Sequence, residues 1–323
     1  MFANLKFQGF QASELGRAVD RVNDMIKWRL SDDKVTPDTP AHLRSKEVRE
    51  NTRCSIFMGC TSNMSSCGMR EYIRYLCQHK MIDVYVTTCG GVEEDFMKTF
   101  NPFYTGDFHL SGEKLHMKGI NRTGNMLVPM HNYHSFDNWL APIIKQMHKE
   151  QKENGTIWSP SKMINRLGKE INNEESIFYW CWKNDIPVFS PALTDGEIGD
   201  ILVDHFVHEE EGFILDIAQD YKKLNDITIS SVKTGVITFG GGVIKHHCLN
   251  PQIRRGGADY AVYINTGIEW DGSDAGAAPD EAVSWGKINA KTQPVKIWAE
   301  ASLVAPILIA ETFAKNFDIA RRV

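Results

Sequence analysis

The chain has 323 residues, of which 42% are hydrophobic and 24% are charged, and its formal net charge at pH 7 is −5. This composition is typical of a folded globular protein and excludes a disordered or fibrous chain. Nucleic acid is not expected as a partner, because its binding depends on a surplus of basic side chains.

The sequence carries no membrane or secretion signal that we can identify. Its longest apolar run, residues 303–310, is far shorter than the roughly 18–20 residues of a membrane span, and it contains Pro306. No basic stretch followed by an apolar block opens the chain. The seven cysteines are an odd number without a C-x-x-C pair, which indicates reduced thiols and no zinc site. We therefore expect a cytoplasmic protein without a bound metal.

An amphipathic helix is predicted near the amino terminus. Apolar residues recur at helical spacing between residues 13 and 30, and Ser13 is a suitable cap. The following residues 31–53 are polar and contain two prolines, which is typical of a connecting loop. We therefore expect residues 1–53 to form a helix and a loop, and residues 54–323 to form the main domain.

A strand–helix–strand pattern follows. We expect strands at residues 55–58 and 83–88, with a Gly/Ser/Thr/Asn loop at 59–68 and a helix at 69–79 between them. Such strands lie parallel. Residues 89–95 then place two glycines and two glutamates directly after the second strand. Ligands of open parallel sheets bind at these carboxyl ends, so this segment is a candidate for binding.

The remainder of the chain alternates in the same way, except that residues 96–129 show no clear period. The other expected elements are helices at 136–151 and after Pro160, a strand at 186–190, a helix beyond residue 200, a helix at 213–224, strands at 235–239, 260–266 and 295–298, and a helix at 302–317. This alternation predicts an α/β fold with a doubly wound, mainly parallel, Rossmann-like sheet in a single large domain and helices on both faces.

The segment 271–287 combines carboxylates, an indole and an amine. Its carboxylates are Asp271, Asp274, Asp280 and Glu281. Trp285 offers a ring face to a cation, an interaction of roughly 0.5–2 kcal/mol. Lys287 would become a nucleophile toward a carbonyl or imine if it were held neutral in a dry pocket. The pattern therefore favours a polyamine site with imine chemistry, while a solvated acidic loop with a surface lysine is the alternative.

A triglycine at 240–242 follows another predicted strand. It would let a phosphate or dinucleotide approach the backbone, but it is not a G-x-G-x-x-G motif, so a purely structural turn remains open. His246 could accept a proton from a substrate amine, or it could be an ordinary surface histidine next to His247. Ser62, Asn63 and the threonine pair 87–88 could bind ribose and phosphate or only cap helices.

Several long motifs together resemble the deoxyhypusine synthase family, and the resemblance runs from Phe2 to the carboxyl terminus. They are Thr87-Thr-Cys-Gly-Gly-Val-Glu-Glu-Asp95, Leu167-Gly-Lys-Glu-Ile-Asn-Asn173, Phe189-Ser-Pro-Ala-Leu-Thr-Asp195, Gly240-Gly-Gly-Val-Ile-Lys-His-His247, Gly257-Ala-Asp-Tyr-Ala-Val-Tyr-Ile-Asn-Thr266 and Glu281-Ala-Val-Ser-Trp-Gly-Lys287. The resemblance implies an NAD-dependent enzyme that moves the aminobutyl group of spermidine onto one lysine of the hypusine-carrying translation factor. This is the first step of hypusine formation, and it passes through an imine on an enzyme lysine.

The resemblance also implies roles for individual residues. Lys287 matches the covalent lysine, and His246 matches a spermidine contact that would accept the amine proton. The other implied spermidine contacts are Glu93, Glu94, Asp200, Asp274, Glu281 and Trp285. The residues that fall where the family holds NAD are Ser62, Asn63, Thr88, Asp195, Gly241, Thr266, Glu300 and Ala301.

Two positions depart from the family pattern, since Glu300 stands where Asp is usual and Gly267 where Ala is usual. The chain also begins almost at the first matched residue, so we expect the amino-terminal extension of many family members to be short or absent. The resemblance implies a homotetramer, possibly with a paralogous subunit. Three alternatives remain, namely a homospermidine synthase that accepts putrescine, a non-catalytic paralogue that activates a partner, and a plain NAD dehydrogenase. The last would not explain the acidic segment with its lysine.

Overall fold

The computed structural model describes residues 2–209 and 211–322. Contacts within the chain divide it into two compact units. The first unit consists of Met1–Cys60, His79–Val86 and Lys222–Val323, and the second consists of Thr61–Gln78 and Thr87–Tyr221. Residues on both sides of position 53 belong to the first unit. The division that we expected between residues 53 and 54 stays a prediction, and the two units are described separately below.

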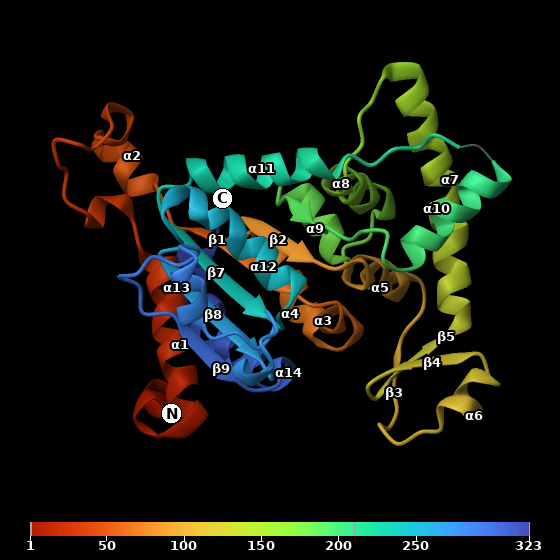
Figure 1. Ribbon diagram of the computed structural model, residues 1–323, viewed down its shortest axis with the longest axis horizontal. Helices are drawn as coiled ribbons and strands as arrows, with labels where there is room; N and C mark the ends of the chain where they lie inside the picture. Colours follow the sequence, from red (N-terminus) through yellow and green to blue (C-terminus); the bar gives the residue numbers. More distant parts are fainter. Residues whose placement is uncertain (1, 210, 323) are drawn as a thin grey trace. The chain divides into compact units, whose positions relative to one another are not determined.

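The first unit contains a parallel sheet with the strand order β2-β1-β7-β8-β9 (Figure 1). The strands are β1 (Ser55–Cys60), β2 (Val84–Thr87), β7 (Thr234–Phe239), β8 (Tyr260–Asn265) and β9 (Val295–Trp298). β1 pairs with β7, β7 with β8 and β8 with β9, all in parallel register. Every residue of β7 is buried, as expected for a parallel sheet that is covered on both faces.

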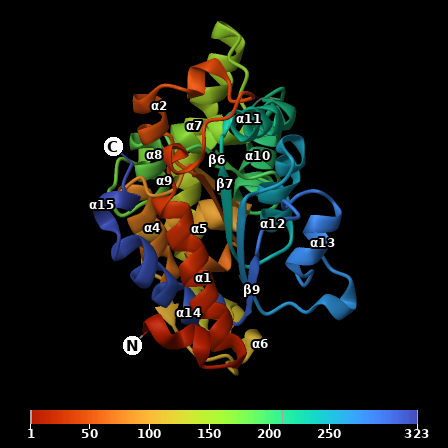
Figure 2. The same ribbon diagram turned by 90° about the vertical axis from the view of Figure 1, so that its left-hand side faces the viewer.

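Helices cover both faces of this sheet. α1 (Phe10–Lys27) packs against β8 and β9, and α12 (Val243–Leu249) packs on the opposite side against β1 and β7 (Figure 2). Gly235 allows the close approach of α1, because a Cβ atom there would lie 2.6 Å from the sulfur of Met25. The α/β fold with a doubly wound parallel sheet, predicted from the alternation of elements, is therefore confirmed.

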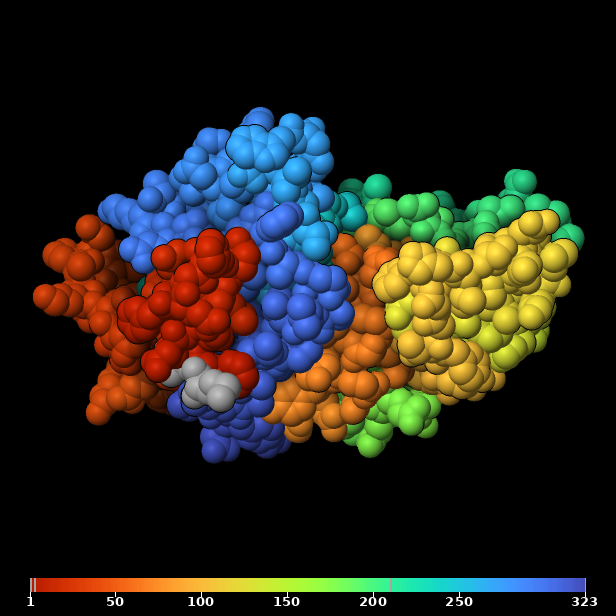
Figure 3. Space-filling model, turned by 90° about the horizontal axis from the view of Figure 1, so that it is seen from below, coloured from red at the N-terminus to blue at the C-terminus, as the bar shows by residue number. Residues whose placement is uncertain are grey.

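The two ends of the chain lie against each other within the first unit, as the adjoining red and blue atoms of Figure 3 show. The amide of Asn316 donates a hydrogen bond of 2.7 Å to the side-chain oxygen of Asn23 in α1. Arg322 donates to Asp83 at 2.7 Å and to the carbonyl of Cys54 at 2.8 Å, beside the sheet. The carboxyl-terminal segment is therefore part of the core of this unit.

The other elements of the first unit are short, apart from one helix after the sheet. They are η1 (Phe2–Phe7), η2 (Leu30–Asp32), η3 (Ala41–Leu43), α2 (Lys46–Asn51), η4 (Asn250–Arg255), η5 (Glu269–Asp271), α13 (Pro279–Ser284), α14 (Ala301–Ile309), the π-helical turn η6 (Ala310–Ala314) and α15 (Phe317–Ala320). The acidic segment is therefore only partly a loop, since α13 occupies its second half.

The second unit is mainly helical. Its helices are α3 (Asn63–Ser66), α4 (Met69–Gln78), α5 (Cys89–Phe100), α6 (Gly112–His116), α7 (Met130–Asn154), α8 (Pro160–Ile171), α9 (Ile177–Lys183) and α10 (Glu197–His208). It also contains the short strand β6 (Val188–Phe189) and a small antiparallel sheet of β3 (Tyr104–Thr105), β5 (Met126–Pro129) and β4 (Ile120–Thr123), in that order. None of the helices in the described ranges has both the length and the apolar character needed to cross a membrane.

Several predicted elements differ from the structure in their bounds. The helix expected from Ser13 begins at Phe10, and the helix expected beyond residue 200 begins at Glu197. The helix expected at 213–224 is α11 (Ile217–Ser230), because Leu215 instead forms a parallel bridge with Trp158. Asp216 then accepts hydrogen bonds from the amides of Ala218 and Gln219 and thereby starts the helix. The helix expected at 136–151 is confirmed, but α7 is longer at both ends.

A buried ion pair joins three helices of the second unit. Asp95 is 0% exposed and accepts hydrogen bonds from Arg70 at 2.7 Å and from the hydroxyl of Ser176 at 2.6 Å. It also accepts a hydrogen bond of 3.0 Å from the amide of Ile177. These contacts connect α4, α5 and the first turn of α9. A buried carboxylate is stable only with such partners, so the network depends on all of its members.

We predict that Asp95→Ala lowers the free energy of unfolding by about 3–5 kcal/mol, because it leaves the charge of Arg70 buried without its carboxylate partner. Glu71 provides a matched control, since it also pairs with Arg70 at 3.1 Å but its side chain is 54% exposed. Glu71→Ala should cost at most about 1 kcal/mol. Urea unfolding followed by circular dichroism measures both values, and equal losses would contradict the buried pair's role.

Candidate active site

The predicted polyamine residues of the first unit meet in one small cavity. Its volume is about 20 Å³, and it is lined by Lys245, His246, Leu249, Asp274, Ala277, Ala278, Glu281, Ala282, Trp285 and Lys287. These residues come from α12, from the segment after β8 and from α13 with the turn that follows it. Residues as far apart in sequence as Lys245 and Lys287 are thus brought to one place, and five of the lining residues are among those that the sequence pattern selected.

The backbone at Lys287 is held by hydrogen bonds on both sides. Its amide donates to the carbonyl of Ala282 at 2.9 Å, and its carbonyl accepts from the amide of Ala258 at 2.9 Å. Gly286 precedes it with a φ of +71°, a conformation that favours glycine. The lysine side chain starts from this fixed turn, and its Nζ lies 5.5 Å from the ring centroid of Trp285.

Asp274 lies between a histidine and a lysine. Its carboxylate is 3.6 Å from Nδ1 of His246 and 3.8 Å from Nζ of Lys245. With Nδ1 turned toward Asp274, Nε2 is the nitrogen of His246 that can meet a substrate. This arrangement suits a proton acceptor whose ring is oriented by a carboxylate.

Sequence reasoning missed Lys245, which is only 3% exposed. Its Nζ lies 5.1 Å from the ring centroid of Tyr263 in β8. Burial lowers the pKa of Lys245, and Asp274 opposes that shift. In the sequence it is one of many lysines, and no pattern there indicates that it points inward. It supplies a positive charge that offsets part of the acidic lining.

The predicted cofactor residues of the first unit lie at the carboxyl ends of β7, β8 and β9. The triglycine turn packs against the acidic segment, since a Cβ atom on Gly241 would be 2.7 Å from the Cα of Ala275. Gly242 has a φ of +65°, and a Cβ atom there would meet nothing within 4 Å. The open side of this turn is therefore at Gly242.

The ends of β8 and β9 offer polar groups suited to a ribose. Asn265 is buried, and in the described part of the chain its side-chain nitrogen has no hydrogen-bond partner. Thr266 is exposed next to it. Glu300 caps α14, accepting hydrogen bonds of 3.0 Å from the amides of Ser302 and Leu303. An unpaired donor, a hydroxyl and a carboxylate at adjoining strand ends fit the hydroxyl groups of a dinucleotide.

In the second unit, the other predicted cofactor residues lie on α3, on α5 and near α10. Ser62 lies close to α5, because a Cβ atom on Gly90 would be 3.0 Å from the Cβ of Ser62. Asn63 begins α3 and is exposed, and Thr88 precedes α5. In the part of the chain that the structure covers, the buried Thr88 hydroxyl has no hydrogen-bond partner. Asp195 is exposed in the turn before α10.

The two neighbouring glutamates of α5 have different surroundings. Glu93 is buried and accepts hydrogen bonds of 3.3 Å from the thiol of Cys89 and from the amide of Ile198. Both bonds go to Oε2 of Glu93, so this oxygen is used within the unit. Glu94 accepts a hydrogen bond from the hydroxyl of Ser66. Burial raises the pKa of Glu94 to about 7, and the bond from Ser66 opposes the shift.

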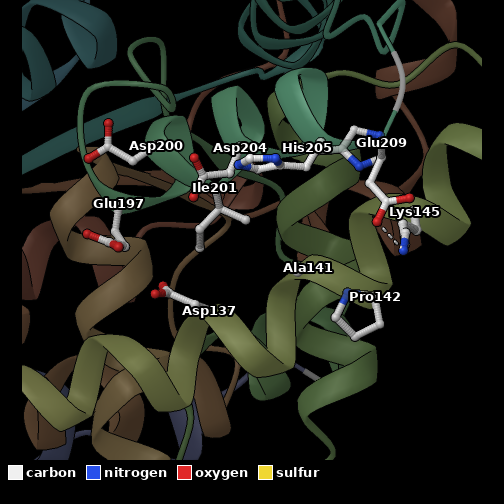
Figure 4. Close-up of a pocket in the computed structure, with 11 residues that line it drawn as sticks. Asp137, Ala141, Pro142, Lys145, Glu197, Asp200, Ile201, Asp204, His205 and Glu209 are labelled. Atoms are coloured by element: carbon white, nitrogen blue, oxygen red, sulfur yellow. Dashed lines mark ion pairs between the residues drawn. The ribbon is translucent and has the colours of Figure 1, made fainter.

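Asp200 lines a larger acidic cavity between α7 and α10 (Figure 4). The cavity has a volume of about 340 Å³ and is lined by Asp137, Ala141, Pro142, Lys145, Glu197, Asp200, Ile201, Asp204, His205, His208 and Glu209. Burial, with the charge of Asp137 next, raises the pKa of Glu197 to about 7. Lys145 and Glu209 form an ion pair of 2.5 Å on the side of the cavity opposite Glu197 (Figure 4).

Sequence reasoning selected only Asp200 from this cavity. Glu197, Asp200 and Asp204 recur at helical spacing, so a search for one acidic face on α10 would have found the other two. Asp137 comes from α7 and had no such signal. Across the described residues, no cluster of three or more His, Cys, Asp or Glu side chains could hold a metal ion.

Comparison with known proteins identifies relatives along nearly the whole chain. The family profile of deoxyhypusine synthase matches residues 1–312. A deoxyhypusine synthase of Arabidopsis thaliana is 52% identical, over 96% of this chain and 85% of its own. Homospermidine synthase 2 of Senecio vernalis is 51% identical, over 98% of this chain and 85% of its own.

A solved structure agrees with these relatives. A crystal structure from Entamoeba histolytica that is ascribed to the same enzyme superposes with a TM-score of 0.70 at 32% identity. It covers 97% of this chain and 90% of its own. From the match over residues 1–312 and the identities above, we conclude that the chain belongs to the deoxyhypusine synthase family.

Proposed function

We propose that the protein is a deoxyhypusine synthase, an NAD-dependent transferase that moves the aminobutyl group of spermidine onto one lysine of the hypusine-carrying translation factor. The observation that carries the proposal is the cavity in which Lys287 lies beside Trp285 together with His246. Membership of the family supports the same reaction. The reaction is the first step of hypusine formation, and we place it in the cytoplasm.

Spermidine is a linear polycation, and the acidic residues suit its amines. The small cavity that contains Lys245, His246 and Lys287 is called the lysine cavity below. In it, Asp274 and Glu281 supply carboxylates, and the exposed ring of Trp285 supplies a face for a cation. From the second unit we assign Glu93, Glu94 and Asp200 to the same substrate. The Asp200 cavity is acidic and therefore attractive to an amine, whereas Oε2 of Glu93 already has partners in α5 and α10.

In the proposed reaction, the carbon–nitrogen bond at the secondary amine of spermidine is oxidised to an imine, and the imine formed with the acceptor lysine is reduced at the end. When bound, NAD supplies the hydride acceptor for the spermidine carbon beside the secondary amine, and it returns that hydride at the end of the reaction. His246, oriented by Asp274, accepts the proton of the secondary amine. Lys287 attacks the resulting imine carbon, and diaminopropane leaves. Lys287 then holds the aminobutyl group as an imine until the acceptor lysine replaces it.

The cofactor is assigned to residues of both units. We assign Ser62, Asn63, Thr88 and Asp195 of the second unit, and Gly241, Thr266, Glu300 and Ala301 of the first. The unpaired polar groups of Thr88 and Asn265 and the carboxylate of Glu300 support this assignment. A carboxylate at the end of a parallel strand is the usual partner of ribose hydroxyls.

We also propose a homotetramer, possibly with a paralogous subunit. The motivation is that the assigned residues are spread from Ser62 to Ala301 and belong to two units of the chain. Light scattering of the active protein measures the mass directly. A monomeric mass at full activity would contradict the assembly.

A homospermidine synthase is the second candidate, because Senecio homospermidine synthase 2 is 51% identical to this chain. Both reactions would use the same lysine and differ in the acceptor amine. Incubation with labelled spermidine and NAD, with either the translation factor or putrescine offered, decides between them. We expect the label on the protein, and label on putrescine alone would favour the second candidate.

The role of Lys287 can be separated from that of the oxidation step. We predict that Lys287→Ala still releases some diaminopropane, because removal of hydride and proton needs His246 and the cofactor but no covalent link. Transfer of label to the acceptor protein should be lost. Lys287→Arg should behave in the same way, since a guanidinium stays protonated and forms no imine.

The measurement combines diaminopropane release, acceptor labelling and borohydride trapping of an enzyme adduct. The native chain should trap its adduct at position 287. If either variant labels the acceptor at a near-native rate, or the native adduct maps elsewhere, the covalent role of Lys287 is wrong.

Polyamine affinity should depend on the protonation of Glu94. Because its pKa is about 7, Glu94 is mostly protonated below that pH and ionised above it. We predict that spermidine affinity rises as pH increases through 7, approaching about tenfold per pH unit on the acidic side for one linked proton. Calorimetric titration between pH 6 and 8 measures the slope.

Glu94→Gln should flatten this slope by removing the titrating group. Glu197→Gln is the matched control, because burial and Asp137 place the pKa of Glu197 at about 7 as well. If Glu197→Gln flattens the slope and Glu94→Gln does not, the acidic cavity and not Glu94 sets the pH dependence.

A further inference from the structure

The carboxylate of Glu94 stands at the end of a chain of hydrogen bonds in the second unit. The hydroxyl of Ser66 donates to Glu94, and the amine of Lys98 donates to the backbone carbonyl of the same serine at 2.6 Å. Ser66 is the last residue of α3, and Glu94 and Lys98 lie one turn apart on α5. Two helices therefore meet at one residue that we assign to the substrate. Sequence reasoning selected neither Ser66 nor Lys98.

Ser66 is a buried donor that is fixed in position. The residue is 2% exposed, and its backbone amide donates to the carbonyl of Ser62 at 3.2 Å. Its hydroxyl also lies 3.4 Å from that carbonyl, but it lies closer to the carboxylate of Glu94. A serine hydroxyl has one proton to donate, and a charged acceptor forms the stronger bond. The proton therefore goes to Glu94.

Lys98 supplies a positive charge next to this bond. Its amine donates to the carbonyl of Ser66 and also to the carbonyl of Cys67, the second at 3.3 Å. Burial lowers the pKa of Lys98 to about 8, with the charge of Arg70 acting in the same direction and that of Glu94 opposing it. The amine is therefore mostly charged at pH 7, and it is held where α3 ends.

The other groups around Glu94 do not favour its ionised form. Burial is the main cause that raises the pKa of Glu94, and the negative charge of Glu93 acts in the same direction. Tyr133 of α7 also faces both glutamates, but burial raises its pKa above the ordinary value, so it stays neutral. The hydroxyl of Ser66 and the charge of Lys98 are the two influences on Glu94 that oppose its protonation.

We propose that Ser66 and Lys98 are positioning residues for the polyamine, which keep the carboxylate of Glu94 in place and ionised. The inference rests on the spermidine contact proposed above for Glu94. Ser66 donates to Oε2 of this carboxylate, and within the described ranges Oε1 has no hydrogen-bond partner. Oε1 is therefore the oxygen left for an ammonium group of the substrate. A protonated Glu94 would offer that group no charge.

Calorimetric titrations of the full chain with spermidine test the proposal, with NADH present because it cannot accept a hydride and so prevents turnover. We expect Ser66→Ala to weaken spermidine about tenfold relative to the native chain at pH 6, since one hydrogen bond to a carboxylate changes its ionisation equilibrium by about that factor. The ratio should shrink toward one above pH 8, where Glu94 is ionised in both proteins. A purely structural defect would weaken binding by the same factor at every pH.

Substitutions of Lys98 give an independent measurement. Lys98→Met removes the amine and should cause a loss with the same pH dependence. Lys98→Arg keeps a cation with hydrogen-bond donors and should retain most of the affinity. Ser65→Ala is the matched control, because Ser65 is also buried in α3 but its hydroxyl donates to the carbonyl of Gly91 at 3.0 Å. It should leave spermidine affinity at its native value across the pH range.

Two results would overturn the inference. Ser66→Ala could bind spermidine as tightly as the native chain at pH 6, or its loss could be equally large at pH 6 and pH 8.5. A native chain that binds no spermidine at any pH would show instead that the proposed substrate is wrong, and the inference would fail with it. That result is distinguishable, because it appears before any variant is measured.

Discussion

The hydrogen bonds that hold the backbone of Lys287 are the constraint on which the first-unit site depends. The amide of this residue bonds to Ala282 in α13, and its carbonyl bonds to Ala258 just before β8. The acidic segment leaves the sheet at the end of β8 and returns to the start of the same strand through these bonds. These bonds place its carboxylates next to α12, the helix that follows β7 and contains Lys245 and His246. A lysine on a free loop would have no fixed relation to either.

Charge then divides this edge of the sheet into two neighbouring environments. In the lysine cavity, Asp274 is shared by His246 and by the buried amine of Lys245, so a carboxylate is kept close to two groups that can carry protons. A neighbouring cavity is lined by Trp270, Lys296 and Trp298. There the amine of Lys296 donates to the carbonyl of Gly267 and lies near the carboxylate of Glu269, which offsets its charge. The lysine cavity therefore keeps free carboxylates in Asp274 and Glu281, whereas the charges that line the neighbouring cavity cancel.

The sequence allowed the fold to be predicted because the strands are apolar runs separated by helical periods, and such an alternation is typical of a parallel sheet covered on both faces. It allowed the lysine cavity to be predicted because Asp274, Glu281, Trp285 and Lys287 lie within one short segment. It could not identify Lys245, since burial of a lysine depends on Tyr263 and Asp274 folding around it. Asp137 was missed for the same reason, because it becomes part of an acidic cavity only where α7 faces α10.

The two departures from the family pattern have local physical explanations. Gly267 packs directly against the acidic segment, because a Cβ atom there would lie 2.9 Å from the Cα of Gly276. The usual alanine would push this segment away from the end of β8, so glycine lets it lie closer. Glu300 has one more methylene than the usual aspartate, and its carboxylate reaches the amides of Ser302 and Leu303 to cap α14. Glu300 therefore keeps both the carboxylate at the end of β9 and the helix cap that the usual aspartate, a preferred N-cap residue, would supply.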